Sequence, residues 1–115
     1  MGFVFIKAGV ANPANTKKTS RVNFLVDSGS LYSVVPQRVL KRLGIKPESN
    51  ITFTLANGQE VKRKVGNALF TYQRRRRASP VIFGNPGDSS LLGMVTLAAL
   101  GFVLDPLRRE LRPLL

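Results

Sequence analysis

The stretch NFLVDSGS, residues 23–30, places a carboxylate where a buried strand runs into a glycine turn. Residues 24–26 form a short apolar run that is typical of a core strand, and Asp27 follows it directly. An isolated ionised carboxylate inside a protein is costly unless hydrogen-bond donors or a shared proton compensate it. Nearby groups must therefore stabilise the Asp27 carboxylate by hydrogen bonds. The nearest donors in the sequence are two serine hydroxyls and the N–H of Gly29. Because glycine has no Cβ, its N–H can approach the carboxylate closely.

An Asp-Ser-Gly that follows an apolar strand resembles the active-site signature of the retropepsin-like aspartic proteases. Downstream, Ser90-Leu91-Leu92-Gly93 resembles the family's second signature, in which two aliphatic residues and a glycine pack behind the catalytic loop. Between them, residues 51–61, ITFTLANGQEV, resemble the hairpin that forms the flap. The three segments stand in the family's order and cover nearly the whole chain. The resemblance implies a mainly β fold, a small closed β-barrel with one or two short helices.

Length and composition limit the chemistry. With 115 residues, the chain has the size of one domain, residues 1–115. It contains no Cys and no His, which excludes thiol nucleophiles, disulfides, Ser-His relays and ordinary zinc sites, so we expect neither metal nor cofactor. A hydrolase with this composition must use carboxylates, and only six acidic residues are present against eighteen Lys and Arg.

The hydrophobic pattern predicts strands and two short helices. Phe3 to Lys7 and Arg21 to Val26 are predicted to form a first hairpin with a polar loop between them. A helix is expected from Pro36 until Gly44 stops it, and a second from Met94 to Leu100, closed by Gly101. The chain is then predicted to end in one strand, Phe102 to Leu104.

Two hairpins are expected in the middle of the chain. Residues 51–55 alternate apolar and polar side chains up to Asn57-Gly58, which predicts a tight type I′ turn before a return strand over 60–65. Ala68 to Tyr72 and Pro80 to Phe83 form the second pair, with the basic run Arg74 to Arg77 capping it.

A single Asp-Ser-Gly implies two chains. Peptide hydrolysis by carboxylates needs two of them close together, sharing one proton. Asp88 and Asp105 stand in different sequence contexts, so the economical solution is a homodimer that brings Asp27 and its symmetry mate together. In the family the chain ends interleave, and the apolar ends Met1 to Ile6 and Arg112 to Leu115 are compatible with this, although such ends also pack on their own domain.

The resemblance also implies roles for individual residues. Asp27 is the expected catalytic residue, Gly29 holds its inner oxygen, and Ser28 bonds across the dimer axis. Ser30 is expected to donate a hydrogen bond to the outer carboxylate oxygen, which would lower the pKa of the dyad. Leu91, Leu92 and Gly93 support the loop from beneath, and Leu55, Ala56, Asn57 and Gly58 form the flap that closes over an extended polypeptide substrate.

Two other functions remain open at this point. The same barrel could be an inactive dimerisation or peptide-binding module, because a fold does not imply an activity. With a net charge of +12 it could instead bind nucleic acid through Arg74 to Arg77, a weaker signal because no base-stacking aromatic residues are interleaved. No apolar run is long enough to span a membrane and the first ten residues do not resemble a secretory signal, so a cytoplasmic location is expected.

Overall fold

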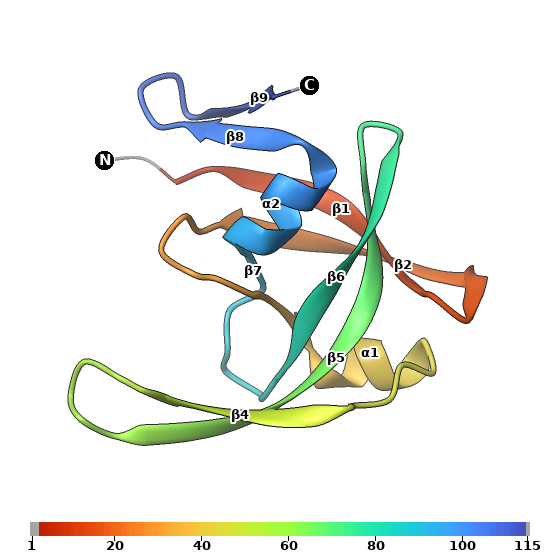
Figure 1. Cartoon of the computed structure of the whole chain (residues 1–115), viewed down its shortest axis with the longest axis vertical. Helices are drawn as coiled ribbons and strands as arrows, with labels where there is room; N and C mark the ends of the chain where they lie inside the picture. The colour runs from red at the N-terminus through yellow and green to blue at the C-terminus, as the bar shows by residue number, and fades with distance from the viewer. Residues whose placement is uncertain (1–2, 115) are drawn as a thin grey trace.

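The computed structural model describes residues 3–114 and consists mainly of strands (Figure 1). The elements in chain order are β1 (Phe5–Asn12), β2 (Asn15–Val26), β3 (Ser33–Pro36), α1 (Gln37–Arg42), β4 (Ser49–Thr54), β5 (Glu60–Tyr72), β6 (Arg75–Gly84), β7 (Leu91–Leu92), α2 (Met94–Leu100), β8 (Phe102–Asp105) and β9 (Glu110–Pro113). The prediction of a mainly β fold with two short helices is confirmed.

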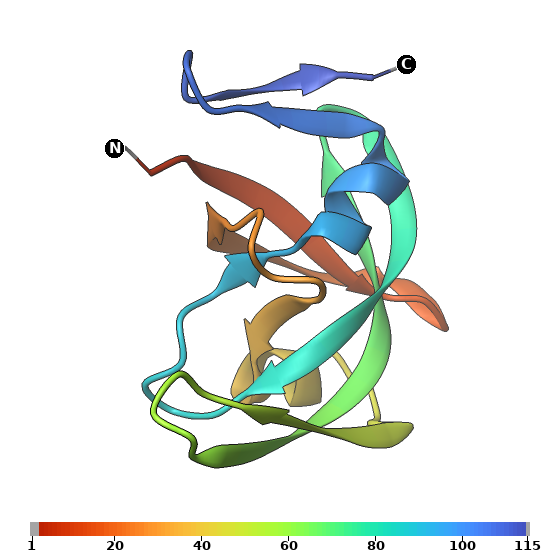
Figure 2. The same ribbon diagram turned by 60° about the vertical axis from the view of Figure 1, so that its left-hand side comes forward.

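The main sheet closes on itself. Its strand order is β1-β2-β7-β3-β6-β5-β4, and β1 pairs in addition with β5, so every strand but β4 belongs to a ring. The strand β4 extends the sheet as a hairpin with the first half of β5. Two pairings, β2 with β7 and β3 with β6, are parallel. The strands β8 and β9 form a separate antiparallel pair above the ring (Figure 2).

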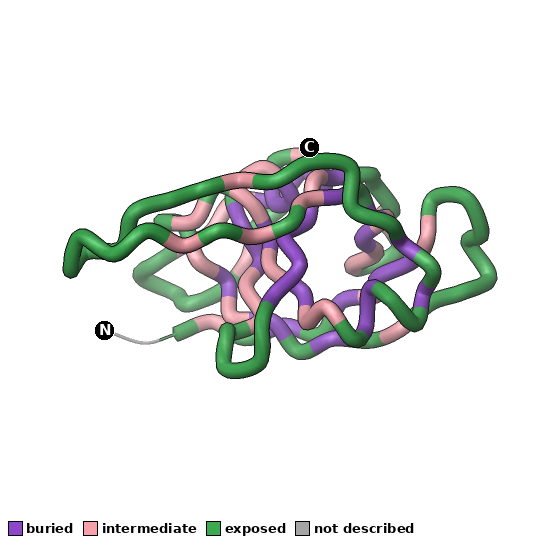
Figure 3. The backbone as a smooth tube through the Cα atoms, turned by 90° about the horizontal axis from the view of Figure 1, so that it is seen from below, coloured by how far each residue is buried: buried purple, intermediate pink, exposed green. Residues whose placement is uncertain are grey.

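The core residues come mostly from the strands of this ring and from α1 and α2, and Figure 3 marks the buried positions along the backbone in purple. Alternate residues over most of β1 point inward, so that Ile6, Ala8 and Val10 are buried while Phe5, Lys7 and Gly9 are more exposed. The rings of Phe24 on β2 and Phe70 on β5 meet in the centre at 6.0 Å between centroids. Because Phe24 is fully buried only three residues before Asp27, the core fixes the strand that carries the carboxylate.

The first hairpin is longer than the sequence predicts. The expected polar loop between Lys7 and Arg21 is largely strand, and the chain turns only at residues 13–14. The amide of Asn12 stabilises this turn: its Oδ1 accepts the Ala14 N–H, and its Nδ2 donates to the Leu43 carbonyl at the end of α1. The prediction of a loop rested on the polar composition of this segment. A strand whose side chains are exposed can be polar, because the backbone pairing with the neighbouring strand stabilises it.

The predicted geometry of the β4–β5 turn differs from the observed one. At the tip of the β4–β5 hairpin, Gly58 has φ of 84° whereas Asn57 has a negative φ, and the Gly58 N–H donates to the Leu55 carbonyl at 2.9 Å. This is a three-residue loop with a left-handed glycine, so the predicted type I′ turn is wrong, although the hairpin itself is confirmed. The two-residue turn with positive φ at both positions lies instead at Gln73 and Arg74.

The basic run therefore does not form a cap. Arg74 lies in the turn, but residues 75–77 belong to β6, and β6 begins five residues earlier than expected. The guanidinium of Arg75 donates to the carbonyls of Leu100 and Gly101 at the end of α2 and lies 4.7 Å from the Phe102 ring centroid. Arg75 thus stabilises the helix end, with φ of 82° at Gly101 completing the stop that the sequence predicts.

The end of the chain differs from the prediction of one final strand. After β8, the chain turns back and adds β9, with Asp105 paired opposite Glu110. Met1, Gly2 and Leu115, which the prediction of interleaved ends includes, lie outside the described residues. Within residues 3–114, none of the helices has the length and hydrophobicity of a membrane span.

Candidate active site

Asp27 lies directly after β2, where the parallel pairing with β7 ends. Leu25 pairs with Leu91, Val26 pairs with Leu92, and the Asp27 N–H donates to the Leu92 carbonyl at 3.0 Å. The chain then turns back, and the Gly29 N–H donates to Oδ1 of the half-buried Asp27 at 2.8 Å. This is the hydrogen bond expected from the sequence, and it fixes one carboxylate oxygen within the loop.

The loop after Asp27 lies on the start of α2. The N–H groups of Met94 and Val95 donate to the carbonyls of Ser30 and Leu31 at 2.9 and 3.0 Å. Gly93 is buried, and a Cβ there would lie only 2.6 Å from the carbonyl carbon of Tyr32. Only glycine permits this close approach. The Leu-Leu-Gly segment therefore packs directly against the loop that follows Asp27.

The two serines differ from expectation. Ser30 Oγ donates to the Tyr32 carbonyl at 2.8 Å, so the expected bond from Ser30 to the outer oxygen of Asp27 is wrong. A serine hydroxyl in a turn commonly bonds to the backbone of that same turn, as Ser30 does here. Ser28 is exposed at the surface of the loop.

A chain of buried hydroxyls holds the far side of the loop, which sequence reasoning missed. Ser33 Oγ accepts the Gly93 N–H at 2.9 Å and lies 2.6 Å from Thr96 Oγ1, which lies 2.8 Å from Ser79 Oγ. Ser79 Oγ also lies 3.2 Å from the Pro80 carbonyl, so each hydroxyl has a place to donate. Ser and Thr in apolar segments were the available signal, but their partners lie 17 and 63 residues apart in the sequence.

An apolar groove runs beside the loop beneath the β4–β5 hairpin. Its first hollow, of about 330 Å³, adjoins Gly29 and Ser30. The second, of about 380 Å³, lies further along, between Leu55 and Asp88. The two hollows share four apolar lining residues, Val34, Phe53, Ile82 and Leu91. The groove is therefore continuous from the Asp27 loop to the loop at residues 85–90.

The predicted flap residues lie at the tip of this hairpin. Leu55 lines the second hollow, whereas Ala56, Asn57 and Gly58 form the exposed turn beyond it. Asn57 Oδ1 accepts the Gln59 N–H, which braces the turn. In Figures 1 and 2 the hairpin projects from the ring on the side of the loop at 85–90.

A charged pair lies at the far end of the groove. Arg63 on β5 donates from Nε to Oδ2 of Asp88 at 2.8 Å and from the NH2 nitrogen to Oδ1 at 3.2 Å. Asp88 Oδ2 also accepts the Asn85 N–H at 2.8 Å. The hydrogen bond from Arg63 lowers the pKa of the Asp88 carboxyl below its ordinary value, and the same bond raises the pKa of Arg63. Among the described residues, no group of three His, Cys, Asp or Glu side chains lies in a metal-binding arrangement.

Comparison with known proteins agrees with this geometry. The sequence model of the aspartyl protease family matches residues 13–96, a span that contains both the Asp27 loop and the Leu-Leu-Gly segment. The chain belongs to the aspartyl protease family. No curated protein matches it in sequence.

Solved structures show the same fold in other members of the group. The protease of simian foamy virus superposes with a TM-score of 0.57 at 21% identity, covering 82% of this chain and 91% of the viral one. A retropepsin-like aspartic protease from Rickettsia conorii superposes with a TM-score of 0.53 at 24% identity, covering 90% and 85% of the two chains. The fold of this aspartyl protease is therefore retropepsin-like, as the sequence predicts.

Proposed function

We propose that this aspartyl protease is an endopeptidase in which Asp27 and the Asp27 of a second copy activate one water molecule. The observation that carries the proposal is the position of Asp27: it lies at a strand end, its Oδ1 accepts the Gly29 N–H, and the apolar groove begins at Gly29 and Ser30 of the same loop. The carboxylate is thus held next to a groove able to take an extended chain.

We infer that the second carboxylate comes from another molecule, because three of the other acids in the chain already have structural partners. Asp88 is bonded to Arg63 and Asn85, and Glu48 is bonded to Asn67. Asp105 accepts the N–H groups of Leu107 and Arg108 in the turn between β8 and β9. These acids already have structural partners away from Asp27. A symmetric dimer with Asp27 on its axis supplies the missing group.

The reaction follows from one proton shared by two carboxyls. The ionised carboxylate takes a proton from water, whose oxygen attacks the peptide carbonyl carbon, while the protonated carboxyl donates to the carbonyl oxygen. Collapse of the tetrahedral intermediate breaks the C–N bond as the nitrogen receives a proton. Ser28 would bond across the axis, and residues 55–58 would close over the substrate and exclude bulk water while the attacking water molecule stays bound.

Exposed apolar side chains indicate where the second copy binds. Four large apolar side chains near the two ends of the chain are exposed: Phe3 before β1, Phe5 at its start, and Leu107 and Leu114 on either side of β9. In Figure 2 these segments lie together at one end of the molecule, above the Asp27 loop. Burying them between two copies would remove apolar surface from water, which favours association.

The test uses Asp27→Asn with Glu48→Gln as a matched control, because both changes replace a carboxylate by an amide. Wild type and Glu48→Gln are expected to cleave a mixed peptide library between about pH 4 and 7, with inhibition by pepstatin-type compounds, whereas Asp27→Asn is inactive. Mixing equal amounts of wild type and Asp27→Asn and allowing subunits to exchange should leave about one quarter of the activity per total protein. Cleavage by Asp27→Asn would reject the mechanism, and a residual activity of one half would reject a shared dyad.

A further inference from the structure

The Arg63–Asp88 pair joins two walls of the groove. Arg63 belongs to the β4–β5 hairpin, and Asp88 belongs to the loop between β6 and β7. Both side chains line the second hollow, and their exposed fractions are 17% and 31%. The pair is bidentate, and Asn85 fixes the carboxylate from behind, so its geometry is well defined.

The pair acts on a part of the hairpin that has few other attachments. Residues 49–54 pair with residues 60–65 of β5, and only from Val65 onward does β5 also pair with β6. Within residues 3–114, the hydrogen bonds of Arg63 to Asp88 are those that connect the outer segment of the hairpin to the loop at 85–90. The distance between hairpin and loop sets the width of the hollow between them.

We propose that Arg63 and Asp88 are positioning residues that hold the hairpin at a fixed height above the groove and so shape a substrate subsite. This inference rests on the proposed peptidase function. The subsite takes a large, neutral, apolar side chain of an extended polypeptide, because its walls include Phe53, Leu55 and Leu91 and its two charges neutralise each other. A charged substrate side chain would lose its hydration there without gaining a free partner.

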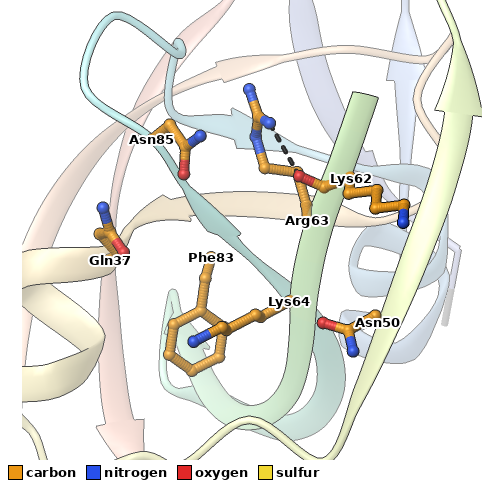
Figure 4. A pocket seen from close by; sticks show the side chains of 7 residues that line it. All are labelled: Gln37, Asn50, Lys62, Arg63, Lys64, Phe83 and Asn85. Carbon is orange, nitrogen blue, oxygen red and sulfur yellow. Dashed lines mark hydrogen bonds between the residues drawn. The ribbon is translucent and has the colours of Figure 1, made fainter. Parts of the chain in front are cut away.

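The opposite face of β5 provides a matched control. Lys62 and Lys64 alternate with Arg63 along β5 and carry the same charge. Neither lysine lines the second hollow, and both line a smaller one of about 180 Å³ that Arg63 and Phe83 also border (Figure 4). On this side of the strand, the NH1 nitrogen of Arg63 donates a hydrogen bond to the backbone carbonyl of Lys62. Replacing Lys64 therefore removes one positive charge from the same strand without touching the ion pair.

A purely structural ion pair and a positioning pair predict different results. Partly exposed salt bridges contribute little to stability, so breaking this one should lower the melting temperature by a few degrees at most. If the pair shapes the subsite, its loss should weaken substrate binding without altering the chemistry at Asp27. The effect should then appear in KM and not in kcat.

The experiment compares Asp88→Asn, Arg63→Gln, the double exchange R63D/D88R and Lys64→Gln on peptides selected from a mixed library. We expect KM to rise about tenfold in both single variants, with kcat within a factor of two, and to recover in the double exchange, while Lys64→Gln resembles wild type. Peptides with Leu, Lys or Glu at the position that fills the hollow should rank Leu first in wild type. An unchanged KM, or an equal rise in Lys64→Gln, would overturn the proposal.

A binding measurement separates this inference from the peptidase proposal. The Asp27→Asn variant, with and without Asp88→Asn, is titrated with the fluorescently labelled peptide library and followed by anisotropy. Weaker binding in the double variant supports the subsite even if no cleavage occurs, in which case only the peptidase proposal fails. Equal binding contradicts the subsite whether or not the wild type cleaves peptides.

Discussion

Gly93 lies directly against the backbone of Tyr32, so that a Cβ at position 93 would be 2.6 Å from the Tyr32 carbonyl carbon and 2.7 Å from its oxygen. Both atoms belong to backbone, which cannot rotate away as the end of a side chain can. This contact places the start of α2 against the loop that carries Asp27, and it explains why a glycine is needed after the two leucines.

Gly93→Ala is expected to shift the loop or the helix and to lower the free energy of unfolding by about 1 to 3 kcal/mol, as overpacking does. Urea denaturation measures the loss, and the peptidase assay should show reduced kcat. Gly9→Ala is the control, because a Cβ there makes an ordinary 3.5 Å contact with Thr71. Similar losses in both variants would show that any added methyl group has this effect.

Thr96→Val should destabilise the protein although it barely changes the side-chain volume. The Thr96 hydroxyl lies between Ser33 and Ser79, all three are buried, and valine leaves both neighbours without that partner. We expect a cost of about 1 to 3 kcal/mol in chemical denaturation. Thr52→Val, on the exposed hairpin, should be close to neutral, and a neutral Thr96→Val would show that the hydroxyl chain contributes nothing.

Replacing the turn residues Gln73 and Arg74 by Asn and Gly should stabilise the protein. Their φ angles are 48° and 68°, a region that costs energy for most side chains and that Asn-Gly favours in type I′ turns. The expected gain is about 1 kcal/mol in the free energy of unfolding. Asn-Gly at Ala56 and Asn57 serves as the comparison, because neither residue there has positive φ, and a gain at both sites would refute the reason given.

The Asp88 carboxyl makes the stability depend on pH at the acidic end. Since the bond from Arg63 lowers its pKa in the folded protein, the stabilisation is complete above the unfolded value, about 3.9, and is lost as the pH falls through the folded value. The difference in melting temperature between wild type and Asp88→Asn should thus stay constant from about pH 7 to 5 and shrink below about pH 4. A difference that already disappears between pH 7 and 5 would contradict the lowered pKa.

The loop at Asp27 and the two helices could be predicted because their signals are local. Three apolar residues before a charged one, a proline before α1 and a glycine after α2 each favour a particular local structure where they stand. The bond from Gly29 to Asp27 spans two residues and could be predicted for the same reason.

Local sequence signals could not predict three features: the turn types, the lengths of the hairpins and the hydrogen-bond acceptor of Ser30. Gln73 and Arg74 do not favour positive φ, but the long pairing of β5 with β6 imposes it. A polar segment such as residues 15–20 becomes a strand because β1 lies beside it. The Ser30 hydroxyl bonds to the Tyr32 carbonyl, a backbone acceptor whose position depends on how the loop folds.

Residue types and their order are known without the fold, so the sequence establishes one Asp-Ser-Gly, a Leu-Leu-Gly downstream of it and the absence of thiol and imidazole chemistry. The three-dimensional fold is needed to bring Gly93 against Tyr32, to join three hydroxyls in the core and to place Arg63 within reach of Asp88 across a groove. Those contacts join residues 17 to 63 positions apart. Such pairs are selected by closure of the whole sheet, and no short segment contains that information.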